Sequence, residues 1–357
     1  MKDAALILCP WLPFIRWLLV PGRIKLPFMP LLDRFRGCLL GGAVGDALGM
    51  PTEGYTAQEI LSRFGPIKEM LPAPEGHFHS GLLAGQFTDD TEETLLLAES
   101  LVESCGFSAE NFAERLASWG CIWTLDERRN RGVGFVTRSA VEALIAGTPW
   151  QQSGLSIPTC GSAMRASPMG LLYHFNLDLV RGYADLQSLP THTSPAARAA
   201  SIAVAIGAAL CLHGFSKEAV AHAAASYAGR LDGEFEDKLL YACSLRGMPA
   251  GEALERIGTS PLATETVPAA FYCFLNFEGE EGLIAAAGGG GDTDSIASIA
   301  GSLFGASQGA SWIPQRWLDP LEERKRIEDA ATGLWQLSCP SAARARRFYI
   351  SSSCFLL

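Results

Sequence analysis

The sequence predicts an all-α fold in one compact domain that spans residues 31 to 337. Apolar residues recur at the three- and four-residue spacing of a helix face, for example at Ile296, Ile299 and Leu303. Alanine is abundant, and no run shows the alternation of β-branched residues that is typical of a strand. Glycine, proline and hydroxyl residues mark the boundaries between the helical segments.

The composition sets the class of protein. The chain has 357 residues, of which 48% are hydrophobic, so it can bury one large core or two modest ones. A net charge of −10 argues against nucleic-acid binding as its main role. The ten cysteines form no CxxC pair and have no histidine at zinc-finger spacing. They predict reduced thiols in a cytoplasmic protein.

The two ends of the chain differ from the domain between them. In residues 1–30, an apolar stretch is interrupted by prolines and an arginine, so no stable membrane span is expected. No clear cleavage site for a secretory signal follows this stretch. Met29 precedes the patterned region, which favours an over-extended gene start over a peripheral arm or lid. The tail, residues 338–357, is expected to be solvated or loosely packed.

Two helices carry glycine at every fourth position. One row comprises Gly37, Gly41, Gly45 and Gly49, and the other comprises Gly301, Gly305 and Gly309, extended backwards by Ala297. Each glycine costs a soluble helix about 1 kcal/mol relative to alanine, so such a row needs a reason. A helix face without side chains lets another helix approach closely. We therefore expect these helices to form the buried centre of the fold, with axes less than about 10 Å apart.

Two helix starts are rich in carboxylates and hydroxyls. Asp292, Thr293, Asp294 and Ser295 follow four glycines, and Thr88, Asp89 and Asp90 precede a second apolar helix. The positive end of a helix favours such carboxylates. If the two starts converge, the shared charges need protons or cations to offset their repulsion. Ligands that are all oxygen point to magnesium or manganese. Two ordinary capped helices are the alternative, and the presence of both motifs favours the metal site.

Other polar positions lie in loops or at helix ends. Glu53 follows the first helix, where its charge opposes the helix dipole, so a chemical role is favoured. His77 and His79 are expected to be solvated loop residues rather than metal ligands. Gly132 and Gly134 form a turn before a helix, where backbone N–H groups suit a phosphate. An ordinary turn is the favoured alternative for this pair.

The rest of the domain is predicted to be helical between loops. A loop is expected over residues 65–87 and a polar insertion over residues 153–170. The predicted helices cover residues 109–123, 139–146, 196–213, 217–228, 235–245, 251–257 and 267–277.

Six motifs occur in an order that resembles a known family. They are RFRGCLLGGAVGDALGMPTE, FTDDTEETLLLAESL, CGSAMRASPMGLL, THTSP, ETVPAAFYCFL and GGDTDSIASIAGSLFGA. Together they are similar to the ADP-ribosylglycohydrolase family over residues 31 to 312. The resemblance implies a compact orthogonal helical bundle with two Mg²⁺ or Mn²⁺ ions in a cleft. It also implies a hydrolase that removes ADP-ribose from an ADP-ribosylated protein or small-molecule acceptor.

The resemblance carries site roles onto this sequence. The implied metal ligands are Thr88, Asp89, Asp90, Asp292, Asp294 and Ser295. Glu53, with Asp89 and Asp90, forms the implied catalytic set. The implied substrate contacts are Gly132 and Gly134 near the diphosphate, Gly161, Ser162 and Met164 around the diphosphate and ribose, and His192. Phe87 replaces a frequent tryptophan, and Ser295 replaces a frequent threonine while keeping a hydroxyl oxygen.

The implied reaction leaves alternatives open. A water held by a metal or by Glu53 would attack C1″ of the distal ribose, whose hydroxyls would bridge to the metals. The ETVPAAFYCFL motif favours a serine-linked or related O-linked acceptor over an arginine-linked one. One alternative is a metal-dependent hydrolase of another nucleotide-like substrate. The other is a catalytically retired ADP-ribose-binding or structural family member, against which the intact ligand set argues.

Overall fold

The computed structural model of the protein describes residues 31–126 and 129–338, and every regular element within these ranges is helical. This confirms the all-α prediction. The predictions for residues 1–30 and for the tail after Ser338 lie outside the described residues. The elements are α2 (Leu31–Gly49), η1 (Met50–Thr52), α3 (Ala57–Phe64), α4 (Asp89–Glu103), α5 (Ala109–Leu125), α6 (Phe135–Ile145), α7 (Trp150–Ser153), α8 (Ser167–Tyr173), α9 (Leu177–Ser188), α10 (Pro195–Leu212), α11 (Lys217–Gly229), α12 (Gly233–Ser244), α13 (Ala250–Ile257), α14 (Ala263–Asn276), α15 (Gly279–Ala287), α16 (Thr293–Gln308), α17 (Gln315–Leu318) and α18 (Arg324–Ser338).

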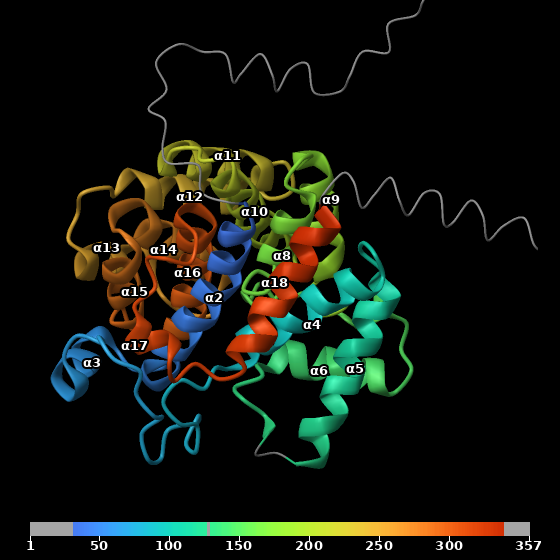
Figure 1. The fold of residues 1–357 in the computed structure, drawn as a ribbon, viewed down its shortest axis with the longest axis horizontal. Helices are drawn as coiled ribbons and strands as arrows, with labels where there is room; N and C mark the ends of the chain where they lie inside the picture. Colours follow the sequence, from blue (N-terminus) through green and yellow to red (C-terminus); the bar gives the residue numbers. More distant parts are fainter. Residues whose placement is uncertain (1–30, 127–128, 339–357) are drawn as a thin grey trace, which may run out of the picture. The chain divides into compact units, whose positions relative to one another are not determined.

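Helices α2 and α16 lie against each other with their backbones in contact (Figure 1). A Cβ atom added to Gly45 would lie 2.1 Å from the carbonyl oxygen of Ala297. One added to Gly301 would lie 2.0 Å from the carbonyl oxygen of Gly41. No side chain larger than hydrogen fits at these positions, which is why both rows are glycine. The prediction of close contact between the two helices is confirmed.

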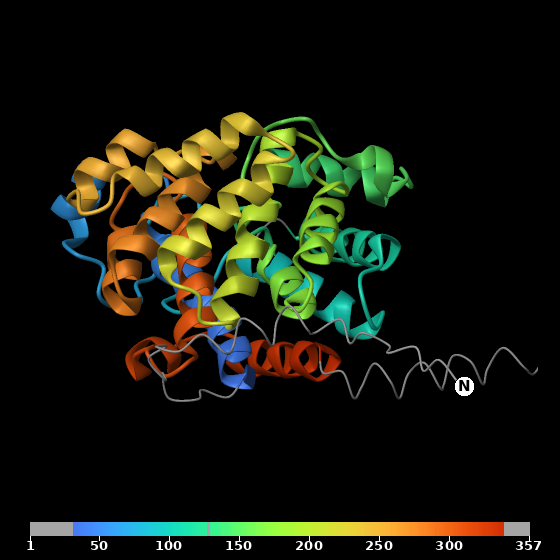
Figure 2. The same cartoon turned by 90° about the horizontal axis from the view of Figure 1, so that it is seen from above.

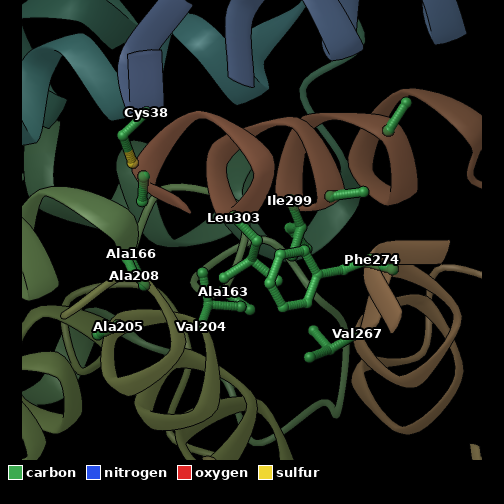
Figure 3. Close-up of a cluster of buried hydrophobic side chains, with 14 of the residues drawn as sticks. Cys38, Ala163, Ala166, Val204, Ala205, Ala208, Val267, Phe274, Ile299 and Leu303 are labelled. Atoms are coloured by element: carbon green, nitrogen blue, oxygen red, sulfur yellow. The ribbon is translucent and has the colours of Figure 1, made fainter. Parts of the chain in front are cut away.

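Other helices enclose this central pair. Figure 2 shows α18 on one side, where it packs against α2, whereas α14 packs against α16. Ile299 and Leu303 of α16 point toward Val204 of α10 and Phe274 of α14 in the core (Figure 3). Among the described helices, only α10 is long and apolar enough to cross a membrane, and 83% of it is buried in the protein. It is therefore a core helix.

Two predicted helix starts were wrong by four residues. Helix α6 begins at Phe135 rather than residue 139, because the glycine turn ends at Gly134 and the next residues already form the first helical turn. Helix α14 begins at Ala263 rather than residue 267 and contains Pro268 in its interior. The Leu262 carbonyl accepts hydrogen bonds from the backbone N–H groups of Glu265 and Thr266. These bonds form the first turn of α14, so the helix starts earlier than the apolar pattern indicates.

The glycine row can be tested by adding a methyl group. Gly301→Ala should destabilise the protein by about 2 kcal/mol. A Cβ 2.0 Å from a backbone oxygen places the overpacking cost at the top of the usual range of about 1–3 kcal/mol, and the gain of about 1 kcal/mol in helix propensity offsets only part of it. Gly251→Ala in α13 is the matched control, since nothing lies within 4 Å of a Cβ at that position. Urea unfolding at fixed magnesium concentration measures both variants. Equal stability of the two would contradict the close packing.

Candidate functional site

The acidic starts of α4 and α16 converge beside the end of α2. The Thr88 hydroxyl oxygen lies 3.3 Å from Oδ2 of Asp294, although the two residues are 206 positions apart in sequence. Thr88 is the N-cap of α4, and its side chain accepts a hydrogen bond from the backbone N–H of Asp90. Asp89, Asp90, Asp292 and Asp294 are all buried at this point. These four residues form the acidic centre.

A glycine turn sets the direction of Asp292. Gly290 and Gly291 have φ angles of 81° and 73°, in the left-handed region that favours glycine. A Cβ atom on Gly291 would lie 2.1 Å from the carbonyl oxygen of Thr259. Asp292 occupies the N-cap position of α16 but makes no side-chain capping bond. Its Oδ2 instead accepts from the Thr266 hydroxyl at 2.6 Å and the Cys160 thiol at 3.1 Å.

Asp46 holds the start of α4 in place beside the acidic centre. The sequence analysis did not identify this residue. It lies within the glycine row of α2 and is fully buried. Its carboxylate accepts from the backbone N–H and hydroxyl of Thr88, at 3.0 and 2.9 Å. It also accepts from both groups of Thr91, at 3.0 and 2.5 Å. Asp46 thereby fixes the start of α4 against α2. An acidic residue inside a glycine-rich, apolar helix was the available signal.

The loop histidines pack against Glu53. Nε2 of His79 lies 2.5 Å from Oε2 of Glu53, and Nε2 of His77 lies 2.7 Å from the Glu53 carbonyl oxygen. The prediction that both histidines are solvated was wrong, since they are 8% and 3% exposed, respectively. His77 and His79 are 24 and 26 residues from Glu53 in sequence, so no local sequence pattern could have predicted these contacts.

A cavity of about 320 Å³ opens onto this centre. Its walls contain most of the residues predicted to touch substrate. These lining residues are Gly132, Gly134, Gly161, Met164 and His192, together with Glu53, Asp89, Asp90, Asp292, Asp294 and Ser295. Phe135, Ile157 and Pro261 add apolar surface, and Phe135 is 70% exposed.

Two predicted site residues lie behind the cavity wall rather than in it. Ser162 is fully buried, and its hydroxyl accepts from Ser201 at 2.9 Å and donates to the Ala197 carbonyl. These bonds turn its side chain toward α10, so Ser162 supports the wall structurally instead of lining it. Thr88 is also fully buried, and its hydroxyl contacts Asp294 on the side that faces away from the cavity.

His192 is held as a neutral ring at the edge of the cavity. Its Nδ1 lies 2.8 Å from the Thr191 hydroxyl and its Nε2 lies 3.0 Å from the Thr159 hydroxyl. The Thr191 hydroxyl also accepts from the buried guanidinium of Arg165 at 2.7 Å. Burial, and next the charge of Arg165, lower the pKa of His192 to about 3. The imidazole is therefore uncharged near neutral pH, and both of its nitrogens already contact threonine hydroxyls.

Burial and mutual repulsion disfavour the ionised form of the acidic groups. The pKa values of Asp89, Asp90 and Asp294 are raised well above the usual range for aspartate. Burial is the largest cause, and neighbouring carboxylates raise these pKa values further. Burial likewise raises the pKa of Glu53, and Asp294 is the next cause. No lysine or arginine is among the described residues that line the cavity. Apart from the positive ends of α4 and α16, the described lining residues supply no positive charge to offset this repulsion.

These groups fit hard divalent cations. Oδ2 of Asp90 is buried and has no hydrogen-bond partner. The carboxylates and the Ser295 hydroxyl of the cavity lining offer oxygen ligands, which magnesium and manganese prefer, and the Cys160 thiol is engaged with Asp292. At the rim, ligand atoms of Glu53, His79 and Asp294 lie within 4.8 Å of one another. A cation at this centre would provide the charge that the cavity lining lacks.

Known proteins are similar in sequence to this chain over most of its length. The ADP-ribosylglycohydrolase family matches residues 29–343. An uncharacterized protein from Archaeoglobus fulgidus is 40% identical over 85% of this chain and 97% of its own length. The ADP-ribosylarginine hydrolase Tri1 of Serratia proteamaculans is 28% identical, over 90% of this chain and 84% of its own. Human ADP-ribosylhydrolase ARH3 is 27% identical, over 85% of this chain and 93% of its own.

A solved structure agrees with these relatives. The structure of an ADP-ribosylglycohydrolase-related protein complex superposes with a TM-score of 0.70 at 29% identity, and covers 87% of this chain and 99% of its own. The family match thus extends from α2 to α18, across both acidic helix starts and the cavity between them. The chain belongs to the ADP-ribosylglycohydrolase family, and it is therefore a hydrolase that acts on a glycosidic bond.

Proposed function

We propose that this protein removes ADP-ribose from an O-linked acceptor, such as an ADP-ribosylated serine, with two Mg²⁺ or Mn²⁺ ions at its acidic centre. The observation that carries the proposal is the convergence of four buried aspartates, with Glu53 at the rim of the same cavity. A ribose ring bound there would place its hydroxyls near the acidic centre and its anomeric carbon near Glu53.

Six residues would hold the cations. They are Thr88, Asp89, Asp90, Asp292, Asp294 and Ser295, with Asp46 fixing the start of α4 behind them. Bound ions would orient the ribose and stabilise negative charge that develops on its oxygens. Asp294 is the central member of this set, since it lies against Thr88 of the other helix start and next to Ser295.

Glu53 is the proposed acid and base, acting with the two aspartates at the start of α4. As a carboxylate it would accept a proton from the attacking water, while the bond from C1″ to the acceptor oxygen breaks. Glu53, now protonated, would then give that proton to the departing acceptor oxygen, so that the products are free ADP-ribose and the acceptor hydroxyl. Such a positioned group contributes about 10²–10⁴ in rate. Gly132, Gly134, Gly161 and Met164 would enclose the diphosphate and ribose, and the neutral ring of His192 would contact the ligand from the cavity wall.

Two observations support an O-linked acceptor. The five carboxylates that line the cavity all belong to the centre itself, so among the described lining residues no further acid remains to bind a guanidinium. Thr266, in the motif similar to the O-linked branch, donates to Asp292 at 2.6 Å and thus belongs to this centre. We further propose that the protein acts in the cytoplasm, which agrees with the seven free cysteines among the described residues.

The substrate can be identified by one assay. Release of free ADP-ribose from serine-linked and arginine-linked ADP-ribosylated peptides is measured with magnesium and with EDTA. We expect magnesium-dependent release from the serine-linked peptide. Faster release from the arginine-linked peptide would contradict the proposed acceptor. Binding of ADP-ribose without release from either peptide would favour the retired family member, and preference for another nucleotide would favour a different hydrolase.

Two variants should separate metal binding from proton transfer. Asp294→Asn should weaken Mn²⁺ binding and activity together, because it removes a charge at the meeting point of both helix starts. Glu53→Gln should lower kcat by about 10²–10⁴ with Mn²⁺ binding retained. Calorimetric titration with Mn²⁺ and steady-state kinetics measure these effects. An unchanged kcat in Glu53→Gln would contradict the proposed role of Glu53 in proton transfer.

The raised pKa values predict a pH-dependent gain in stability from metal. Burial raises the pKa of Asp46 to about 6 and raises the pKa of the aspartates around it, so the folded protein keeps protons that the unfolded chain has lost. Without metal, these groups therefore destabilise the fold increasingly as pH rises above about 4. Magnesium needs the deprotonated carboxylates, so it should raise Tm more at pH 8 than at pH 6.

The comparison with EDTA at each pH isolates the acidic centre. Buried histidines such as His192 have a lowered pKa and affect stability with the opposite sign, but they cancel in the difference between magnesium and EDTA. Thermal melts at both pH values provide the measurement. An equal rise in Tm at pH 6 and pH 8 would show that the carboxylates do not bind the cation.

A further inference from the structure

Glu53 lies where the surrounding charges repel it. Ligand atoms of Glu53, His79 and Asp294 lie within 4.8 Å of one another, and Asp89 and Asp292 line the same cavity. The Glu53 side chain is 20% exposed, so an outward rotamer would place the carboxylate in water and relieve this repulsion. A fixed hydrogen-bond donor beside the carboxylate would favour the inward position of Glu53 over the outward one.

The loop with the two histidines supplies that donor. The loop closes on itself through a bond from the Ala73 N–H to the Leu82 carbonyl, at 3.0 Å. Within it, the Ser80 N–H donates to the His77 carbonyl at 2.8 Å, and the Leu82 N–H donates to the His79 carbonyl at 3.1 Å. These turns direct both imidazole rings toward Glu53.

The bonds of His77 define its tautomer. The backbone N–H of His79 donates to Nδ1 of His77 at 3.2 Å, so Nδ1 is an acceptor. The proton of the neutral ring then lies on Nε2, which donates to the Glu53 carbonyl oxygen at 2.7 Å. His77 thus holds the backbone of Glu53 and leaves its side chain to the neighbouring imidazole.

His79 is packed on every side. Its side chain is fully buried, and its Nδ1 has no hydrogen-bond partner. A bare Nδ1 with the proton on Nε2 avoids burying an unpaired N–H group. Nε2 is then the donor to Oε2 of Glu53 at 2.5 Å. On its other side, a Cβ atom on Gly132 would lie 2.4 Å from Cε1 of His79, so the glycine turn closes over the ring.

We propose that His79 is a positioning residue: it holds the Glu53 carboxylate at the acidic centre by one hydrogen bond, and it is itself held by the Gly132 turn. The proposal rests on the proposed function, because Glu53 must act on water for its position to affect the rate. Removing the donor should lower kcat through Glu53 and leave metal binding intact.

A double-mutant cycle tests this coupling. His79→Phe keeps a ring but removes the donor, and it should lower kcat by about 10–100-fold with little change in KM or Mn²⁺ affinity. His79→Gln can place an amide N–H near the position of Nε2 and should restore part of kcat. In a Glu53→Gln background, His79→Phe should cause little further loss. His222→Gln, at an exposed histidine of α11, is the control and should match the wild type.

Two results would overturn the proposal. A full additional loss from His79→Phe in the Glu53→Gln background would show that His79 does not act through Glu53. A parallel loss of Mn²⁺ affinity and kcat in both His79 variants would make His79 a ligand or a purely structural residue instead.

A second measurement does not depend on catalysis. In the ¹⁵N-labelled, Mg²⁺-bound protein, the Nε2 proton of His79 should give a slowly exchanging, downfield NMR signal that disappears in Glu53→Ala. Absence of this signal, or its persistence in Glu53→Ala, would overturn the proposal. If the signal behaves as expected but the wild type releases no ADP-ribose, the proposed reaction fails while the hydrogen bond to Glu53 stands.

Discussion

The backbone contact between α2 and α16 is the constraint on which the site depends. The two helices run antiparallel, so the end of α2 meets the start of α16: a Cβ atom on Gly37 would touch Gly309, and one on Gly49 would touch Thr293. The Thr293 hydroxyl donates to the Gly49 carbonyl at 2.9 Å and ties the two ends together. Asp46 and Glu53 come from one helix and its extension, and Asp292 and Asp294 come from the start of the other.

This arrangement assembles an electrostatically unfavourable site on a rigid base. Two unit charges 4 Å apart repel by about 4 kcal/mol at an effective dielectric constant of 20, and several such pairs meet here. The surrounding core must hold these groups in place when no cation is bound. Asp46 is well supported by hydrogen bonds, whereas Oδ2 of Asp90 has no partner. The difference separates a carboxylate that positions a helix from one that is available to a ligand.

Sequence patterns predicted the helical fold, the central glycine contact and the two acidic helix starts, because each is encoded by local spacing. Some helices were missed although they had a local signal. Thr56 and Glu59 form a capping box before α3, and Asn176 caps α9. Both helices are short or amphipathic, and their apolar residues are too few to stand out beside the core helices.

The missed site residues had weaker signals. His77 and His79 are ordinary loop histidines until the fold brings Glu53 to them, and Asp46 is a single acid within a glycine row. Ser162 shows the opposite case, since its motif is close to the cavity but its hydroxyl is engaged by Ser201. The direction in which a side chain such as that of Ser162 points depends on the helices that pack against the motif, and the motif itself does not encode that packing.

Anomalous diffraction from crystals grown with Mn²⁺ tests the central claim most directly. We expect two peaks between the starts of α4 and α16, coordinated by oxygens of Asp89, Asp90, Asp292 and Asp294. A single peak would reduce the proposed pair to one ion. No peak at this centre, or peaks coordinated by other residues, would contradict the account.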